Sequence, residues 1–132
     1  MTTPRSAWVP FDLSVKMDVS ADIANGDVVI CCAPIPWAGT VKEIWAVADI
    51  LPTSGSLTVQ KAVGTVDASL LAATLTINTG LTANVAANLT LATTPVDLRV
   101  AATNMLRATW TFTTIGSGEG YGCIVWIEPD VW

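Results

Sequence analysis

The sequence of 132 residues contains no histidine, and charged residues make up 13% of it. Without histidine the chain has no Ser-His or Cys-His nucleophile system, and it lacks the commonest metal ligand. Ordinary soluble domains carry roughly 25% charged residues, so this surface must be unusually poor in charge. The six Lys and Arg residues stand singly and the net charge is −5, which argues against nucleic acid as a partner.

Cysteine is also scarce. The chain has three, of which Cys31 and Cys32 are adjacent and Cys123 is remote. This spacing is not a disulfide framework, and free thiols in a reducing cytosol explain it. In a regular strand Cys31 and Cys32 point to opposite faces of the sheet, so they cannot hold one zinc ion together. We therefore expect neither a metal site nor a cofactor.

Long hydrophobic runs are missing as well. The longest apolar run, Val28–Ala33, is too short to span a bilayer and is followed by Pro34 and Pro36, so we expect no membrane insertion. The first residues lack the apolar core of a signal peptide. Yet 52% of the residues are hydrophobic, more than a domain of this size buries. Part of this excess is expected at a subunit interface or a docking surface.

What the chain does contain is apolar/polar alternation, which predicts strands. In Leu106–Thr113 every second residue is apolar, and the residues between are three threonines and Arg107. Successive side chains of a strand point to opposite faces, so Trp110 and Phe112 are expected to join two sheets in the core. Phe11–Val19 alternates just as completely and predicts one long strand with a wet and a dry face.

Further strands are expected between turn signals. Val28–Ala33 indicates a buried strand, and Tyr121–Glu128 a closing strand. Thr40–Ile50 carries apolar residues on both faces, as in a central strand or one beneath an interface. We expect Ser56–Val63 to pair back onto it as a hairpin, and Gly116–Gly120 to form another hairpin tip.

The remaining segments have weaker patterns. Thr74–Asn78 and Asn88–Thr93 predict short strands, and Leu98–Thr103 a connection. Gly64–Ala73 favours an irregular crossover between sheets, with a helical turn as the alternative. Leu81–Ala87 is compatible with a loop or a short helix.

About eight strands without a long helix or a fixed repeat predict an all-β chain, an antiparallel β-sandwich. Residues Met1 to Pro10 are rich in polar and proline residues and are expected to form an extended N-terminal arm. We divide the chain into this arm with the first strand, residues 1–22, and a β-sandwich domain, residues 23–132.

The acidic residues do not indicate catalysis. Glycoside chemistry needs two carboxyl groups ~5–10 Å apart across a cleft, whereas most acids here lie at turns or on the polar side of strands. Asp49 is the exception, because it lies between Ala48 and Ile50 on a strand with apolar residues on both faces. An intersubunit salt bridge is favoured there over catalysis. We expect no catalytic residue and no enzymatic activity.

The six tryptophans are the strongest lead. Trp110 and Trp126 lie on well-patterned strands and predict packing in the core or on a sheet face. Tryptophan is enriched where chains meet, and stacking on sugar rings is its rival use. The residues predicted to form an interface are Trp8, Phe11, Leu13, Val15, Trp37, Trp45 and Trp132.

A series of Thr-, Ala- and Val-rich segments runs through about two-thirds of the chain. They are Gly39–Ala48, Leu57–Lys61, Leu75–Ile77, Leu89–Thr93, Asn104–Arg107, the Trp110 strand and Cys123–Pro129. This series resembles the small head-decoration, or capsid-cement, proteins of tailed bacteriophages, which have a jelly-roll-like sandwich. Such proteins often carry Gly-Asp before the Leu-Arg strand, where this chain has Asn104-Met105.

The resemblance implies a structural virion protein, made in the bacterial cytoplasm, that binds the outside of a capsid. It further implies a homotrimer that clamps neighbouring subunits of the major capsid protein. Many copies held by moderate contacts stabilise a shell through avidity. The alternative is a host-surface or carbohydrate-binding module of a phage head or tail fibre.

Overall fold

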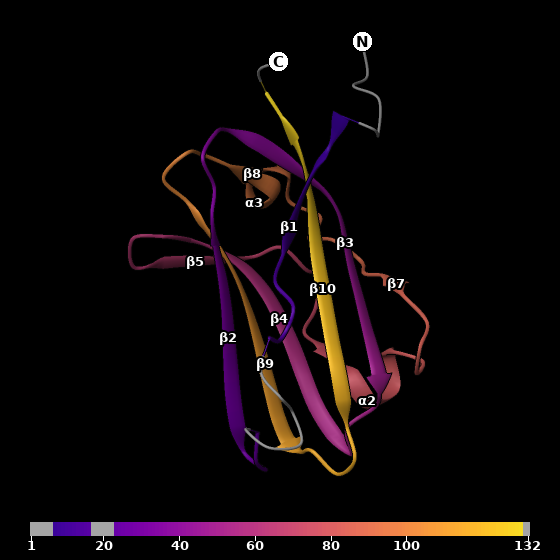
Figure 1. Cartoon of the computed structure of the whole chain (residues 1–132). Coiled ribbons are helices and arrows are strands. Elements are labelled where there is room, and N and C mark those ends of the chain that lie inside the picture. Colours follow the sequence, from indigo (N-terminus) through magenta and orange to yellow (C-terminus); the bar gives the residue numbers. More distant parts are fainter. Residues whose placement is uncertain (1–6, 17–22, 131–132) are drawn as a thin grey trace.

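The computed structural model describes residues 7–16 and 23–130. The described chain is built almost entirely of strands, which run along the sandwich in Figure 1. The strands are β1 Val9–Asp12, β2 Asp27–Pro34, β3 Gly39–Ile50, β4 Ser54–Val63, β5 Val66–Ser69, β6 Leu75–Thr76, β7 Ala87–Asn88, β8 Arg99–Val100, β9 Met105–Thr114 and β10 Glu119–Pro129. Two single-turn helices, α2 Ile77–Gly80 and α3 Pro95–Leu98, lie in the connections.

The strands form two antiparallel sheets. Sheet A has the order β1-β10-β3-β7, with β8 also paired to β3. Sheet B has the order β2-β9-β4-β5, with β6 also paired to β4. The chain changes sheet at nearly every long connection, and in each sheet an early strand lies beside a late one. This is the order of a jelly roll, so the predicted antiparallel, jelly-roll-like sandwich is confirmed.

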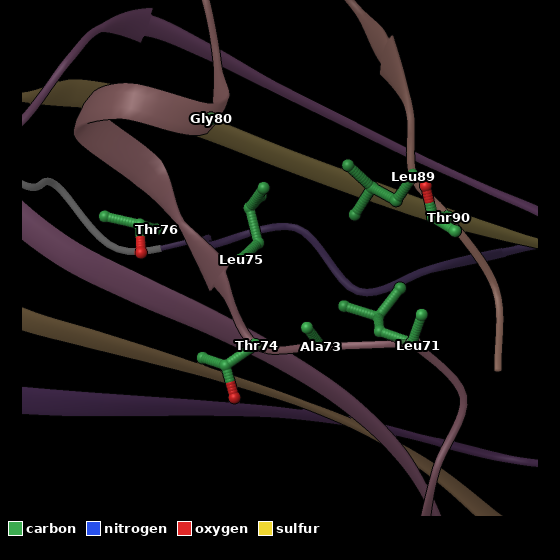
Figure 2. Close-up of a pocket in the computed structure, with 9 residues that line it drawn as sticks. Leu71, Ala73, Thr74, Leu75, Thr76, Gly80, Leu89 and Thr90 are labelled. Atoms are coloured by element: carbon green, nitrogen blue, oxygen red, sulfur yellow. The ribbon is translucent and has the colours of Figure 1, made fainter.

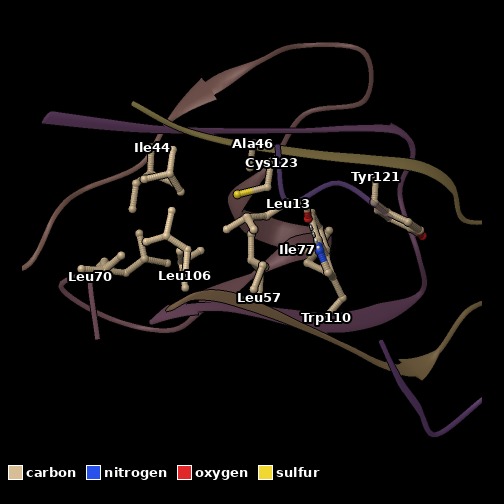
Figure 3. Packing of buried hydrophobic residues seen from close by; sticks show 14 of the residues in the cluster. Leu13, Ile44, Ala46, Leu57, Leu70, Ile77, Leu106, Trp110, Tyr121 and Cys123 are labelled. Carbon is tan, nitrogen blue, oxygen red and sulfur yellow. Dashed lines mark hydrogen bonds between the residues drawn. The ribbon is translucent and has the colours of Figure 1, made fainter. Parts of the chain in front are cut away.

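The core lies between the sheets and is centred on β9. Leu106, Ala108, Trp110 and Phe112 are all fully buried, as the alternation of this strand predicts. The ring of Tyr121 on the opposite sheet lies 5.6 Å from that of Trp110 and 4.8 Å from that of Phe112. Figure 3 shows Leu106, Trp110 and Tyr121 in the space between the sheets. The prediction that Trp110 and Phe112 join the two sheets is confirmed.

The chain after β1 bends into this core. Leu13 is fully buried, and its carbonyl accepts a 3.3 Å hydrogen bond from Nε1 of Trp110. The backbone still follows β10, because the amides of Leu13 and Val15 donate to the carbonyls of Cys123 and Tyr121. The predicted Phe11–Val19 strand is therefore too long: the regular strand ends at Asp12, and residues 17–22 lie outside the described part.

An irregularity in sheet A decides which side chains of β3 face outward. The register between β10 and β3 shifts between Trp126 and Ile127. Val41 and Ile44 consequently both point into the core, while the two residues between them, Lys42 and Glu43, are half-exposed. Bulges re-aim side chains in this way. Trp45 and Val47 then fall on the outer face, as predicted for this central strand.

Two predicted hairpins are wrong. Ser56–Val63 belongs to β4, which pairs with β9, β5 and β6 in sheet B rather than with β3 in sheet A. The Gly116–Gly120 segment likewise carries the chain from β9 in sheet B to β10 in sheet A. Polar, glycine-rich turns look alike in the sequence whether they join neighbouring strands or opposite sheets.

The remaining predicted segments differ from the structure in several ways. Val28–Ala33 is a strand but not a buried one, because β2 lies at the edge of sheet B. The Gly64–Ala73 region contains β5, which forms a hairpin with β4 around Gly64, a residue with φ of +62°. Thr74–Asn78 contains the two-residue strand β6, whereas Asn88–Thr93 overlaps the two-residue strand β7 at Asn88 only. Leu98–Thr103 is mostly a connection, as expected, although β8 lies within it.

Candidate binding surfaces

The outer face of sheet A carries a cluster of large apolar side chains. Strand pairing aligns Pro10 with Trp126, and Ile124 with Trp45, across neighbouring strands. The residues of this cluster are Trp8, Trp45, Val47, Ile124 and Trp126, and we call it the tryptophan face. Trp8, Trp45, Val47 and Trp126 are half-buried, and Ile124 is 37% exposed. An apolar surface of this kind is typical of a contact site.

Carboxylates hold two of these indoles in place. Nε1 of Trp8 donates to Oε2 of Glu128 at 3.2 Å, and Nε1 of Trp45 donates to Oε2 of Glu43 at the same distance. Nζ of Lys42 lies 3.8 Å from the same Glu128 oxygen. Each indole thus has its polar edge satisfied by its own chain. Both rings remain partly exposed on the surface.

A shallow hollow lies within the tryptophan face. It has a volume of about 260 Å³, and its lining includes Trp45, Val47, Gly122 and Ile124. Gly122 forms its floor, since a Cβ there would lie 3.0 Å from Cγ1 of Val47. Ser14 closes one side, and its hydroxyl accepts a 3.0 Å hydrogen bond from the amide of Cys123. The hollow accepts a flat or apolar group beside the Trp45 ring.

The outer face of sheet B is of another kind. Its central strands β9 and β4 point Thr109, Thr111, Ser56 and Thr58 outward, in register with one another. Arg107 ends this row and is held by its neighbours: Nη2 donates to Gln60 at 3.1 Å and also pairs with Asp67. Short hydroxyl side chains cover this face, and the large apolar groups appear on its edge strand β2 instead.

A second apolar hollow opens between the two sheets, on the loops beyond β5. Figure 2 shows Leu71, Leu75 and Leu89 converging on it, with threonines at its rim. Its volume is about 230 Å³ and it is lined by residues 71–76, 80, 89 and 90. None of these residues is ionisable, so the hollow holds an apolar group by packing and offers no group for acid–base chemistry.

The third depression is polar and wide, with a volume of about 590 Å³. Asp67 and Asp97 lie on its wall, together with Ser69, Thr93 and Thr94. Asp67 is already paired with Arg107. Asp49, the acid singled out from the sequence, is exposed at the end of β3 and lines neither this depression nor the two hollows.

The thiols take separate positions. Cys32 is exposed and Cys31 half-buried on opposite faces of β2, as alternation predicts, while Cys123 is buried in the core. Burial raises the pKa of the Cys31 thiol, and raises that of Cys123 to about 12.

Within residues 7–16 and 23–130, no three His, Cys, Asp or Glu side chains gather as metal ligands. In the same part of the chain, no helix is long and apolar enough to cross a membrane.

The residues predicted to form an interface are dispersed by the fold. Trp8 and Trp45 lie together on the tryptophan face. Phe11 and Trp37 instead pack against each other, with ring centroids 5.7 Å apart. Both are partly buried against the core of their own chain. Val15 is half-buried beside the core as well. Trp132 lies outside the described residues.

Leu13 does not fit the predicted interface. Its side chain is fully buried in the core of its own chain. The chain still follows β10 here, and Leu13 lies on the same side of it as Phe11 and Val15, the side that faces the core. A partner therefore has no access to Leu13 in this fold.

Sequence reasoning missed two surface features. Ile124 and Trp126 flank Trp45 on the tryptophan face, and Val28 and Ile30 are exposed on β2. The sequence did contain a signal for Ile124 and Trp126. They alternate with Cys123, Val125 and Ile127 on one strand, so both faces of that strand are apolar. The exposure of Val28 and Ile30 had no local signal, since a continuous apolar run fits a buried strand equally well.

Comparisons with known proteins identify no relative: no family model, curated protein or solved structure matches this chain.

Proposed function

We propose that this chain is a structural protein of a bacteriophage particle that binds the outer surface of the capsid and stabilises it. It acts without catalysis and bridges subunits of the major capsid protein. The observation that carries the proposal is the tryptophan face, a rigid apolar surface on a small jelly roll. Jelly rolls are a common fold of viral capsid proteins, and the resemblance of the strand segments to capsid-cement proteins supports the same reading.

The tryptophan face has the composition of a contact site rather than of a solvated surface. Tryptophan is enriched among the residues that contribute most to binding, above all when apolar neighbours exclude water around it. Here Trp45 lies opposite Ile124 of the adjacent strand β10, and Val47 follows it two residues later on the same face of β3. The hydrogen bonds to Glu43 and Glu128 orient the rings before binding. Less conformational entropy is then lost on contact.

The partners in this proposal are the major capsid protein and further copies of this chain. A homo-oligomer, such as the trimer that the resemblance implies, multiplies the number of tryptophan faces that reach one shell. Moderate contacts then become strong through avidity. In this proposal the chain is located on the exterior of the virion after synthesis in the host cytoplasm.

The test is binding of the purified chain to capsids of the phage that encodes it, purified without this protein. Ile124→Lys places a charge in the middle of the tryptophan face, and Trp45→Ala removes its central ring. Thr111→Lys is the matched control, because it places the same charge on the outer face of sheet B. We expect both sheet A variants to lose binding at least ~30-fold, the effect of a hot-spot residue, and the control to bind like the parent.

Equal binding of all variants would overturn the assignment to this face. Absence of the chain from purified virions, measured by mass spectrometry, would overturn the proposed function as a whole.

A carbohydrate-binding module is the second candidate, and the hollow beside Trp45 favours it. Gly122 leaves room for a sugar ring against the Trp45 indole. Asp12 is an acidic residue on the neighbouring strand, where it lies opposite Ile124 in the pairing of β1 with β10. Binding on a glycan array that disappears in Gly122→Ala and Trp45→Ala would favour this candidate. Capsid binding without any glycan signal would exclude it.

A further inference from the structure

Strand β2 is a long edge strand with an open side. It pairs with β9 through eight residues, Asp27–Pro34, and no other segment in the described part of the chain pairs with its far side. Val28 is 53% exposed and Ile30 58% exposed on its outer face, and Cys32 follows them on the same face. Figure 1 shows β2 at one edge of the sandwich. Such an edge presents unpaired backbone groups beside apolar side chains.

The other edges of the sandwich are protected. Edge strand β1 of sheet A has four residues, among them Pro10 and the charged Asp12. On the far edge of sheet B, β5 also has four residues, and its Asp67 is paired with Arg107. Short strands, prolines and charges are the usual means of preventing edge-to-edge pairing. From Val28 to Ala33, β2 has none of them.

We propose that β2 is a self-association edge, at which two copies of this chain pair their β2 strands antiparallel about a two-fold axis. A two-fold axis places a strand opposite itself, so any charged residue near its centre would face its own like charge. This chain has a net charge of −5, yet the six residues from Val28 to Ala33 are uncharged. The edge therefore suits a second copy, because it avoids the repulsion that other parts of the surface would produce.

The pairing has a defined register. Directly opposite residues in an antiparallel pair point to the same face, so outward residues must meet outward residues. Pro34 has no amide hydrogen to donate, which disfavours a register that includes it. Of the registers that satisfy both conditions, the one that pairs the most residues of β2 places Ile30 on the axis, opposite its own copy. Val28 then lies opposite Cys32, and Asp27 opposite Ala33, so the carboxylates stay apart.

The resulting dimer joins two copies of sheet B into one continuous sheet. The tryptophan face lies on sheet A and stays exposed on both copies. Self-association through β2 is therefore independent of the proposed capsid binding, and each can fail without the other. This two-fold contact also differs from a trimer, so the measured number of subunits separates the two.

The first test is the mass of the purified full chain by light scattering over a wide concentration range. We expect a species of twice 13.8 kDa that dissociates on dilution. Ile30→Lys and Val28→Lys should each weaken the dimer ~30-fold or more, because they place like charges across the axis. The matched control is Val66→Lys, which adds the same charge at a 67% exposed valine on the opposite edge of sheet B. It should leave the dimer intact.

A parent chain that stays monomeric at high concentration, or forms a three-fold species, would overturn the proposal. So would equal dimerisation of Ile30→Lys and Val66→Lys. Circular dichroism and thermal unfolding of each variant verify that the lysine has not unfolded the sandwich.

Hydrogen exchange of the parent chain tests the same edge without a mutation. In the dimer the β2 amides that point away from β9 become hydrogen-bonded, so their exchange should slow with rising protein concentration. The amides of β5 should be unaffected. Exchange in β2 that does not change with concentration would contradict the proposal. The variant Ile124→Lys should dimerise normally even if it loses capsid binding, which keeps the two proposals distinguishable.

Discussion

The two sheets of this sandwich share one core but present different outer faces. Sheet A displays Trp45, Ile124 and Trp126 across its central strands, whereas the corresponding strands of sheet B display threonines and serines. Both faces obey the same alternation, and both sheets bury equally apolar residues inside. The pattern of buried residues thus leaves the composition of each outer face open. The proposed binding is therefore placed on sheet A, and the hydroxyl-rich face of sheet B is expected to be a solvated surface.

The largest effect is expected in the core that the sheets share. Trp110→Ala removes a fully buried indole and its hydrogen bond to the carbonyl of Leu13. Large-to-small substitutions of this kind cost ~3–5 kcal/mol, measured as the loss in free energy of unfolding by denaturant titration. Trp126→Ala, on the outer face of sheet A, should cost roughly 1 kcal/mol because its ring is half-exposed. Equal losses would remove the distinction between an inner, structural tryptophan and an outer, binding one.

The second prediction concerns capsid affinity and reverses this order. Trp45→Ala should lower affinity at least ~30-fold while changing the free energy of unfolding by about 1 kcal/mol or less. Thr109→Ala, its counterpart on the face of sheet B, should change neither quantity. Isothermal titration with purified capsids, together with denaturant unfolding, provides the two numbers. A variant of sheet B that lost affinity would contradict the assignment of the faces.

Thiol reactivity provides a graded measure of the exposed edge and the buried core of the sandwich. Cys32 should react first with an aromatic disulfide reagent at pH 8, because it is exposed on the outer face of β2. Cys31 should follow slowly, since burial raises its pKa and lowers the fraction of thiolate. Cys123, with its pKa raised to about 12, should react only as the chain unfolds. Simultaneous reaction of all three thiols would show that the sandwich opens readily.

The smallest effect is expected at the edge of sheet A. Hydrogen bonds from Lys16 and Ser14 lower the pKa of Asp12 from 3.8 to about 2. Its contribution to stability is therefore fully present above about pH 4 and disappears as the pH falls toward 2. Denaturant unfolding of the parent and of Asp12→Asn should differ by a constant amount near neutral pH, and this difference should vanish in acid. A difference that grows in acid would contradict the assigned ion pair.

The orientation of side chains within each strand, toward the core or outward, could be predicted because alternation is a local property of the sequence. The inner face of β9 and the outward position of Trp45 follow directly from the order of apolar and polar residues. The same holds for the opposite orientations of Cys31 and Cys32. In each case a residue and its second neighbour carry the whole signal.

The partners of the strands could not be predicted in the same way. The turns before Ser56 and at Gly116–Gly120 have the composition of hairpin tips, but both carry the chain to the opposite sheet. Which strand lies beside which depends on contacts remote in sequence. The exposure of Val28 and Ile30 has the same origin, because an apolar run becomes an edge or a centre according to its neighbours.

The candidate site was recovered in part. Trp8 and Trp45 were selected because tryptophan outside the core favours contacts, and both lie on the tryptophan face. Leu13 was selected from the alternating Phe11–Val19 pattern, but the apolar side of that pattern faces the core at Leu13, so its side chain is buried. Whether Phe11, Val15, Trp37 and Trp132 contact a partner stays a prediction.

The central claim is that the outer face of sheet A binds a capsid. Electron cryomicroscopy of particles decorated with this chain tests it most directly, because it shows which face meets the shell. We predict density for the sandwich on the capsid exterior, with Trp45 and Ile124 buried against the major capsid protein and the threonines of sheet B facing solvent. A bound sandwich with its tryptophan face turned to solvent, or particles that carry none of this chain, would contradict the account.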